Sequence, residues 1–327
     1  MTQLSIRFSP PLRSRGVRVV LGFNQLFFAV LFIHLSNTNA GECQSYKPFV
    51  WQLGDGPQTS FLMGSIHLAH PDIYPLPAAV EDAFSACDDL IVEANPEAMN
   101  EADMQHLLLL RSVDTSGRPL AEKIPPETLQ ELRRLVEKHP LEMGMLDRLN
   151  PWYIAQIISL LELKRLGVDP QRGIDLHFIK KASGTKSVLE LEGIEQQLEL
   201  FDGMTEFEQS LMLQYTVRDL EHLEEAFGDI ISAWKSGDPE RLDELLTAWM
   251  KGGEGLEAVF EKLFTERNKQ MKLKISRFLQ DGKRHFIIVG AGHLVGQEGL
   301  LHLLAKDGFT VRQIGTKERI EGIFLEK

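Results

Sequence analysis

Short apolar runs alternate with longer amphipathic stretches along most of this chain. The short runs are bounded by glycine, proline or charged residues, which is typical of buried strands. They predict strands at 49–53, 61–66, 90–92, 187–191, 285–289, 310–314 and 320–325. The first two flank the turn-forming segment 54–57, Gly-Asp-Gly-Pro, so we expect them to form a hairpin.

The longer stretches have helical character and are separated by glycine and proline. They predict helices at 78–87, 101–112, 126–138, 151–166, 174–183, 195–201, 206–277 and 297–306. The seventh is interrupted near 237–239 and 252–253. Strands that alternate with helices favour an α/β fold. We therefore predict a central mixed sheet with flanking helices and two helical insertions.

Four polar side chains follow directly after four of the predicted strands. They are His67, Glu93, Glu192 and His293. The strands before both histidines end in glycine, which permits a sharp exit of the chain from the sheet. Ligands in such sheets bind beyond the carboxyl ends of the strands, so we expect the four side chains to form a site at one edge.

Spacing alone does not select the two histidines. Gly-x-x-His occurs at His67, His285, His293 and His302, against about 0.8 occurrences (10 × 26/327) expected by chance. His285 begins a predicted strand and His302 lies within a predicted helix, so we interpret both as packing or surface residues. His67 and His293 differ because each follows a strand.

The glutamates also have structural interpretations. A carboxylate that leaves an apolar strand is costly unless it is paired or binds a cation. Glu93 therefore fits a metal ligand, a salt bridge or a helix cap. Glu190, Glu192 and Glu195 lie close together, and strand alternation puts the first two on one face. The sequence leaves open which of the three faces the site.

Imidazole and carboxylate groups together suit a hydrolytic metal ion with an open position for water, such as manganese, cobalt or zinc. The chain lacks the motifs Gly-x-Ser-x-Gly, Gly-Lys-Ser/Thr and His-Glu-x-x-His. The sequence therefore does not indicate a serine hydrolase with a Gly-x-Ser-x-Gly motif, a nucleotide-dependent enzyme or a zincin metalloprotease. We interpret His70, Tyr74 and Trp152 as parts of the scaffold.

The composition bounds the class of protein. The 327 residues are 43% hydrophobic and 25% charged, which suffices for a full core. The net charge is −12, and without the four arginines of residues 1–40 it is −16, from 31 basic and 47 acidic side chains. Such an acidic protein gains nothing from counterion release, so we expect no nucleic-acid partner. In an oxidising compartment the two cysteines, Cys43 and Cys87, either form one disulfide or stay free.

The first 40 residues differ in kind from the rest. Arginines without any acidic residue precede an apolar run at 19–35, and small polar residues follow up to Ala40. This order is typical of a secretory signal peptide, so we predict a signal at 1–40 and a periplasmic or secreted hydrolase domain at 41–327. The alternative is an uncleaved membrane anchor, because the run is slightly shorter than the ~20 residues that span a bilayer.

Several sequence blocks surround the predicted site. They are FLMGSIHLAHPDIYPLPAAVEDAF with LIVEAN, then RGIDLHFIKKA, LELEGIEQQLELFD, ERNKQM and VGAGHLVGQEGLLHLLAKDGFTV. From about Trp51 to the C-terminus they resemble the TraB/PrgY/GumN family, whose animal relatives are the Tiki proteases. Ser65 stands where the family has a threonine. Gly193 replaces another threonine and Gln196 replaces an acidic residue, and these two changes affect the hydrogen bonds around Glu192.

The resemblance implies a fold similar to erythromycin-esterase-like and haem-binding ChaN-like proteins. For the Tiki branch it implies a metal-dependent peptidase activity. Carried over by position, the two family histidines are His67 and His293 and the first-block glutamate is Glu93. The later family positions are Glu192, Glu266, Arg267 and Asn268. By pattern alone, Arg267 is an ordinary helical residue.

We therefore predict an exported metal-dependent hydrolase that acts on a peptide or another small molecule. His67, Glu93 and His293 are the predicted ligands of manganese, cobalt or zinc, and Glu192 is the predicted general base on the bound water. We expect the protein to contact the membrane only through its N-terminal signal or anchor.

Arg267 and Asn268 are predicted to stabilise the oxyanion that develops during hydrolysis. Two other functions are compatible with the same residues. A binding protein would take up a peptide signal or a porphyrin without breaking a bond. A metal-independent esterase would use His67 or His293 directly as its general base.

Overall fold

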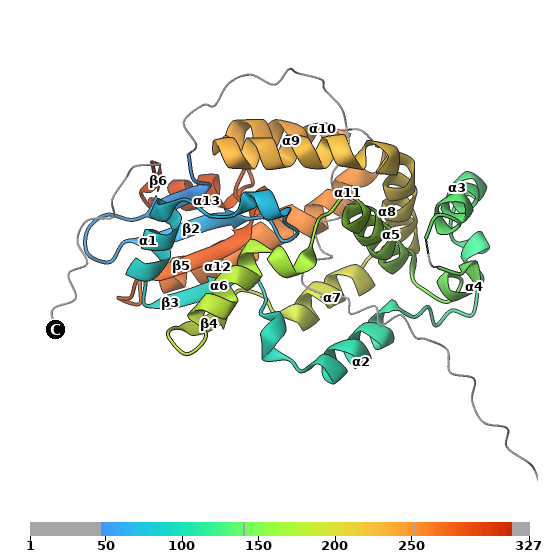
Figure 1. The fold of residues 1–327 in the computed structure, drawn as a ribbon, viewed down its shortest axis with the longest axis horizontal. Coiled ribbons are helices and arrows are strands. Elements are labelled where there is room, and N and C mark those ends of the chain that lie inside the picture. The colour runs from blue at the N-terminus through green and yellow to red at the C-terminus, as the bar shows by residue number, and fades with distance from the viewer. Residues whose placement is uncertain (1–46, 140, 252, 316–327) are drawn as a thin grey trace, which may run out of the picture.

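The computed structural model describes residues 47–139, 141–251 and 253–315 (Figure 1). The predicted signal at 1–40, the predicted strand at 320–325 and Cys43 lie outside this part. Cys87 is buried, and its pairing with Cys43 stays a prediction. Among the described residues, no helix is both long and apolar enough to cross a lipid bilayer.

A six-stranded mixed sheet forms the centre of the fold, as predicted, in the order β4-β3-β5-β2-β1-β6. The strands are β1 (Val50–Leu53), β2 (Ser60–Ser65), β3 (Asp89–Val92), β4 (Ser187–Glu190), β5 (His285–Gly290) and β6 (Val311–Gln313). β4, β3, β5 and β2 are parallel neighbours, whereas β1 is antiparallel to β2 and to β6. The predicted hairpin of β1 and β2 is confirmed.

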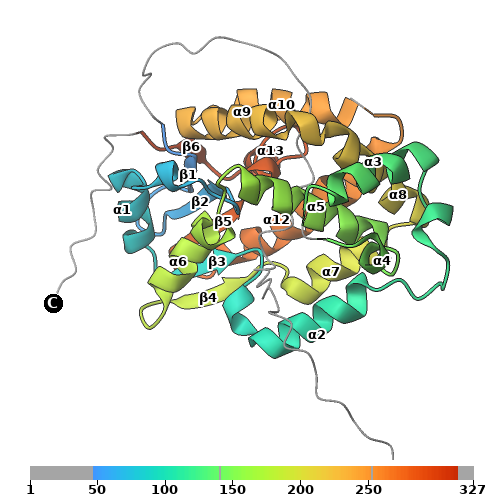
Figure 2. The same cartoon turned by 45° about the vertical axis from the view of Figure 1, so that its right-hand side comes forward.

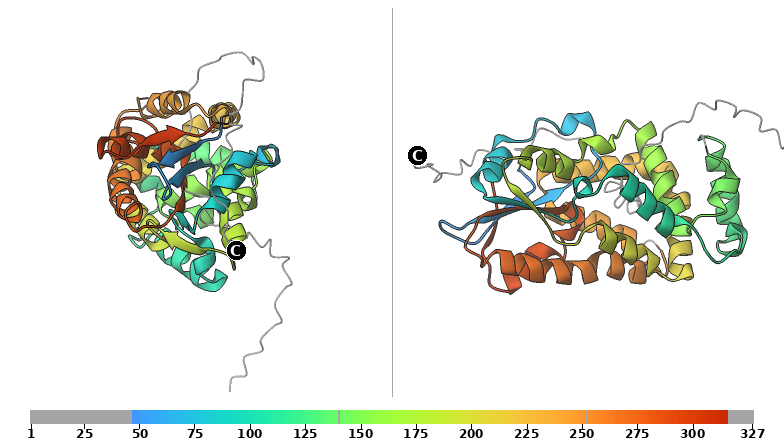
Figure 3. Two further views of the ribbon diagram at one scale, coloured as in Figure 1. Left: turned by 90° about the vertical axis from the view of Figure 1, so that its left-hand side faces the viewer. Right: turned by 90° about the horizontal axis from the view of Figure 1, so that it is seen from below.

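The inner strands are apolar on both faces because helices cover both. Every residue of β2, β3 and β5 is buried. Helices α12 (Glu266–Phe278) and α13 (Leu300–Lys306) lie on one side of the sheet, and α1 (Ala78–Ala86) and α6 (Ile174–Ala182) on the other (Figure 3).

Two long helical insertions leave the sheet, as the sequence predicts. The first runs from β3 to β4 and includes α2 (Glu101–Ser112), α3 (Pro126–Val136), α4 (Met143–Leu146), α5 (Pro151–Arg165) and α6. The second runs from β4 to β5 and holds α7 (Ile194–Asp202), α8 (Glu206–Asp219), α9 (Leu223–Ser236), α10 (Pro239–Lys251), α11 (Leu256–Phe260), the π-helical turn η7 (Glu261–Thr265) and α12. Figure 2 shows α5 and α8 beyond the end of the sheet, with α9 and α10 along its top.

Two hydrophobic clusters stabilise these parts. One surrounds the sheet, and the other joins the helices of both insertions, mainly through α5 against α8. The half-buried ring of Phe227 packs against both clusters. We call the helices of the second cluster the helical part, and its contact with the sheet cluster around Phe227 the seam. The strand ends that carry the predicted site face this seam.

Several predicted boundaries differ from the structure. The sequence suggested a helical stretch from 206 to 277 with two interruptions, but the described residues form five α-helices, a 3-10 turn at Leu220–His222 and a π-helical turn there. The helix predicted from 297 begins at Leu300, because Gly299 is the N-cap and its backbone is extended (φ −79°, ψ 154°). The short helix α4 was not predicted.

Helix α8 begins with a capping box that we expect to stabilise the helical part. Thr205 Oγ1 accepts from the Glu208 N–H at 3.2 Å, and Glu208 Oε2 accepts from the Thr205 N–H at 2.6 Å. Thr205→Ala should lower the free energy of unfolding by about 1 kcal/mol, measured by urea titration. Thr59→Ala, in an exposed turn, is the control and should have a smaller effect. Equal losses would contradict the role of the cap.

Candidate functional site

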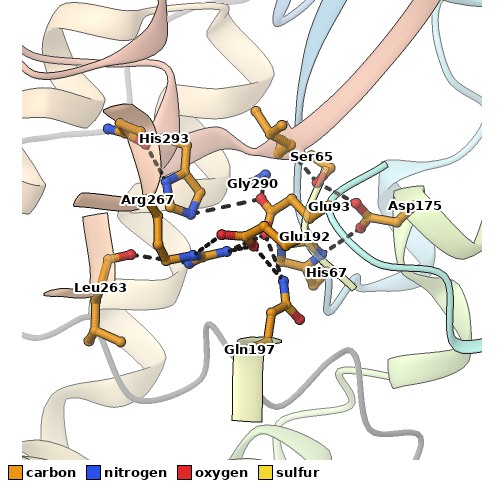
Figure 4. Close-up of polar contacts among 12 residues, drawn as sticks. Ser65, His67, Glu93, Asp175, Glu192, Gln197, Leu263, Arg267, Gly290 and His293 are labelled. Carbon is orange, nitrogen blue, oxygen red and sulfur yellow. Dashed lines mark hydrogen bonds and ion pairs between the residues drawn. The ribbon is translucent and has the colours of Figure 1, made fainter. Parts of the chain in front are cut away.

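The four parallel strands bring the four predicted polar side chains together at one edge of the sheet. His67 follows β2, Glu93 follows β3, Glu192 follows β4, and His293 lies in the 3-10 turn η8 (Ala291–His293) after β5. Their side chains are 8%, 4%, 2% and 0% exposed. Figure 4 shows His67 and His293 on either side of Glu93.

The guanidinium of Arg267 joins the two glutamates. Its Nη2 lies 2.7 Å from Glu93 Oε2 and 2.6 Å from Glu192 Oε2, and its Nε donates to Glu192 Oε1 at 2.8 Å. Its Nη1 donates to the carbonyl of Leu263, at 3.1 Å, in the π-helical turn before α12. Gln197 Nε2 donates to both carboxylates, at 3.2 and 3.1 Å. This arrangement fixes both carboxylates in position.

The two glutamates are electrostatically unequal. Burial raises the pKa of Glu93, and Arg267 and His67 do not outweigh it. Burial acts in the same direction on Glu192, but its bidentate contact with Arg267 leaves the pKa of Glu192 below the ordinary value. Glu93 therefore binds a proton more readily than Glu192 does.

A second hydrogen-bond chain orients His293. The amide of Asn268 donates through Nδ2 to the carbonyl of Glu298, at 2.8 Å, so its Oδ1 accepts from His293 Nδ1 at 2.6 Å. This assigns the proton of the neutral ring to Nδ1 and the lone pair to Nε2. Nε2 lies 3.8 Å from Glu93 Oε1. Burial, together with the positive charges of Arg267 and His67, lowers the pKa of His293 well below its ordinary value.

His67 is oriented by a residue that the sequence analysis did not select. Its Nδ1 lies 2.7 Å from Asp175 Oδ2, and Ser65 Oγ donates to Asp175 Oδ1 at 2.8 Å. Burial lowers the pKa of His67, but Asp175 and Glu93 together outweigh it and the net shift is upward. The two histidines thus have opposite shifts, a pattern typical of acid–base pairs. Asp175 lies in the block RGIDLHFIKKA that resembles the family, but the local pattern gave it no role because an aspartate in the first turn of a helix is common.

The structure decides which of the three neighbouring glutamates enters the site. β4 ends at Glu190, and the chain then turns through Gly193, whose φ is +97° and favours glycine. Glu192 consequently points inward, while Glu190 and Glu195 are exposed. The alternation argument was wrong here because the strand ends before Glu192. Glu266 is also exposed, and with Gln196 it lines a polar cleft that reaches Glu192 and Arg267.

The residues interpreted as scaffold pack as expected. The indole of Trp152 is buried and stacks on Phe201 with ring centroids 4.8 Å apart. His285 is buried beside Asp281, and His302 is exposed on α13. Tyr74 donates to the carbonyl of Arg172 at 2.9 Å.

The nitrogen and oxygen atoms of the site share one feature with metal-binding sites. Both histidines have Nδ1 engaged by an oxygen, which is common in metal-binding histidines. Within the described residues, however, no three histidine, cysteine, aspartate or glutamate side chains are placed to hold an ion. Glu93 accepts hydrogen bonds from Arg267, Gln197 and the Gly290 N–H, the last at 2.6 Å. As arranged, His67, Glu93 and His293 do not form a complete metal site.

Comparisons with known proteins agree with the sequence blocks. The model of the TraB/PrgY/gumN family matches residues 49–313. The chain is 26% identical to the uncharacterised protein YbaP of Shigella flexneri over 264 residues, which cover 76% of this chain and 89% of YbaP. YbaP of Escherichia coli is 26% identical over 258 residues, covering 74% and 86%.

A third relative covers a smaller part. The metalloprotease TIKI homolog of the sponge Amphimedon queenslandica is 27% identical over 99 residues, which are 30% of this chain and 17% of that protein. No solved structure matches the chain. The similarity to erythromycin-esterase-like and ChaN-like folds therefore stays a prediction.

The first prediction for the site concerns the protonation of His67. Because Asp175 is the main group that opposes the effect of burial, Asp175→Asn should move the pKa of His67 from above its usual 6.5 to below it. The measurement is an NMR titration of the imidazole nitrogens in metal-free protein. His293 is the internal comparison, because burial and Arg267, the two largest causes of its low pKa, are unchanged in the variant, so its pKa should stay low. A His67 pKa that stays above 6.5 in Asp175→Asn would contradict this assignment.

The second prediction concerns Arg267. Arg267→Met leaves two buried carboxylates without their cation and should lower the free energy of unfolding by about 3–5 kcal/mol at pH 7. Denaturant titration measures this loss. Arg241→Met removes a partly exposed guanidinium that pairs with Glu244, and as the control it should cost less than about 1 kcal/mol. Adding Glu93→Gln and Glu192→Gln to Arg267→Met should recover part of the stability, and a further loss would contradict the electrostatic cause.

Proposed function

We infer that this chain, which belongs to the TraB/PrgY/gumN family, is a hydrolase whose reactive centre contains His67, Glu93 and His293. The observation that carries the proposal is the pair of buried histidines at the ends of neighbouring parallel strands. Each ring has its Nδ1 fixed by a different acceptor, and their pKa values are shifted in opposite directions. Such pairs supply a base and an acid at the same pH.

In the proposed reaction, neutral His293 is the general base. We propose that the attacking water binds within hydrogen-bond distance of both His293 Nε2 and Glu93 Oε1, which lie 3.8 Å apart. His293 takes a proton from this water as the oxygen attacks the substrate carbonyl. His67, whose raised pKa favours the imidazolium, gives a proton to the leaving group. The bond between the carbonyl carbon and the leaving nitrogen or oxygen then breaks, which gives an acid and an amine or alcohol. His293 releases its proton to solvent and His67 takes one up from solvent, so both return to their starting states.

The remaining residues of the cluster position this pair. Arg267 offsets part of the negative charge of Glu93 and Glu192, and its donors are engaged by those carboxylates and by the carbonyl of Leu263. Asn268 holds the tautomer of His293. We therefore propose positioning roles for Arg267 and Asn268. Their predicted role in stabilising an oxyanion, like that of Glu192 as general base, stays a prediction.

A peptide bond is the substrate bond that we propose. This choice is supported by the partial similarity to a protein named as a metalloprotease, the TIKI homolog. Metal binding by His67, Glu93 and His293 stays a prediction, and no step above depends on it. A metal ion bound there would have to replace Arg267 as the partner of Glu93. The assay therefore includes chelation and the addition of metal ions.

The test is hydrolysis of a fluorogenic peptide library by the purified protein, before and after chelation, and with manganese, cobalt or zinc added back. His293→Ala and His67→Ala should each lower kcat/KM by about 10²–10⁴-fold. The matched control is His302→Ala, because His302 is an exposed histidine on α13, and it should retain full activity. Thermal melting checks that all three variants fold.

The outcomes separate the alternatives. Activity that survives chelation supports catalysis by the histidines alone, and activity that returns with an ion supports the predicted metal ligands. Folded His67→Ala and His293→Ala proteins with full activity would show that the site is wrong. Tight binding of peptide or porphyrin by calorimetry, without turnover under any condition, would replace the hydrolase by a binding protein.

A further inference from the structure

We propose that the substrate carries a small branched aliphatic side chain next to its scissile bond, and that this side chain enters an apolar cavity beside His67. The inference rests on the proposed function because it assigns a substrate class to the same centre. It concerns a different set of residues, so the two can fail separately.

The cavity lies at the seam between the sheet and the helical part. Its far wall consists of apolar side chains from three helices, namely Leu163 of α5, Leu223, Phe227 and Ile230 of α9, and Leu242 of α10. Leu163, Leu223, Ile230 and Leu242 are buried, and Phe227 is half-buried. These residues come from both insertions, so the cavity exists only when the insertions fold back against the sheet.

The near wall is the reactive centre itself. Residues 65–68 at the end of β2 and residues 291–292 in η8 line the cavity, so His67 forms part of it and His293 is the next residue in the chain. A group in this cavity therefore lies beside the proposed acid.

The chemistry of the walls selects an apolar occupant. The polar side chains in the lining are Ser65 and His67, and both are engaged by Asp175. A polar side chain placed here would lose its hydrogen bonds to water without adequate replacement. An aliphatic group loses no hydrogen bonds and gains from burial of its apolar surface.

The size of the cavity narrows the class further. Its volume is about 40 Å³, enough for about three water molecules. The terminal methyl groups of a valine or leucine side chain fit this space, with the rest of the side chain outside it. An indole ring or a porphyrin is too large for it. The polar clefts near Glu192 and Arg267 are larger, at about 300 and 270 Å³, and suit the polar backbone of a peptide.

The first experiment measures binding without turnover. Methyl NMR spectra of the full-length protein are recorded during titration with N-acetyl-leucinamide or, as the matched ligand, N-acetyl-glycinamide. The methyl signals of Ile230 and Leu223 should shift saturably with the leucine compound and remain unchanged with the glycine compound. Equal responses to both compounds, or none, would overturn the proposal.

The second experiment changes the wall. Phe227→Trp reduces the space and should lower kcat/KM for substrates with leucine at the tested position by about tenfold or more, with glycine substrates much less affected. Phe207→Trp is the control, because Phe207 is 67% exposed on α8 and lies outside the cavity. The leucine-dependent NMR shifts should disappear in Phe227→Trp and persist in Phe207→Trp.

The results distinguish the two proposals. Binding of the leucine compound without hydrolysis of any substrate supports the cavity and contradicts the hydrolase. Hydrolysis with the same kcat/KM for glycine and leucine substrates supports the hydrolase and contradicts the cavity. A folded Phe227→Trp protein that is more stable than wild type but has unchanged selectivity would show that the cavity is only a packing defect, and would overturn the inference.

Discussion

The pairing of one guanidinium with two buried carboxylates is the constraint on which the site depends. Glu93 and Glu192 leave neighbouring parallel strands, and two such charges would repel each other strongly in a buried environment. Arg267 lies within 2.8 Å of both and supplies the compensating charge. Because Arg267 belongs to α12, this contact also fixes the second insertion against the carboxyl edge of the sheet.

The two insertions have parallel roles around this cluster. The first insertion supplies Asp175, which orients His67, and the second supplies Asn268, which orients His293. Each histidine comes from the sheet, so each ring is positioned by a contact between the sheet and one insertion. The apolar cavity lies at the same seam, where Phe227 packs against both hydrophobic clusters. Folding of the helical part is thereby coupled to the geometry of the reactive centre.

Much of the fold follows from local pattern. Apolar runs such as 286–289 predicted the buried strands, and glycine and proline marked most helix boundaries, because these signals act over a few residues. The prediction was less accurate at the ends and irregular parts of helices. The helix predicted from 297 begins at Leu300, after Gly299 in an extended conformation, and the π-helical turn before Arg267 has no sequence signal.

The sequence by itself determined that His67, Glu93 and His293 meet, together with one of the glutamates near the end of β4, because parallel strands place the residues that follow them at one edge. The tertiary structure decided the electrostatics. It paired Arg267 with both glutamates, selected Glu192 over Glu190 and Glu195, and brought Asp175 to His67 from 108 residues away. These are contacts between segments remote in the chain, so local pattern does not contain them, and they set which imidazole binds a proton and which remains neutral.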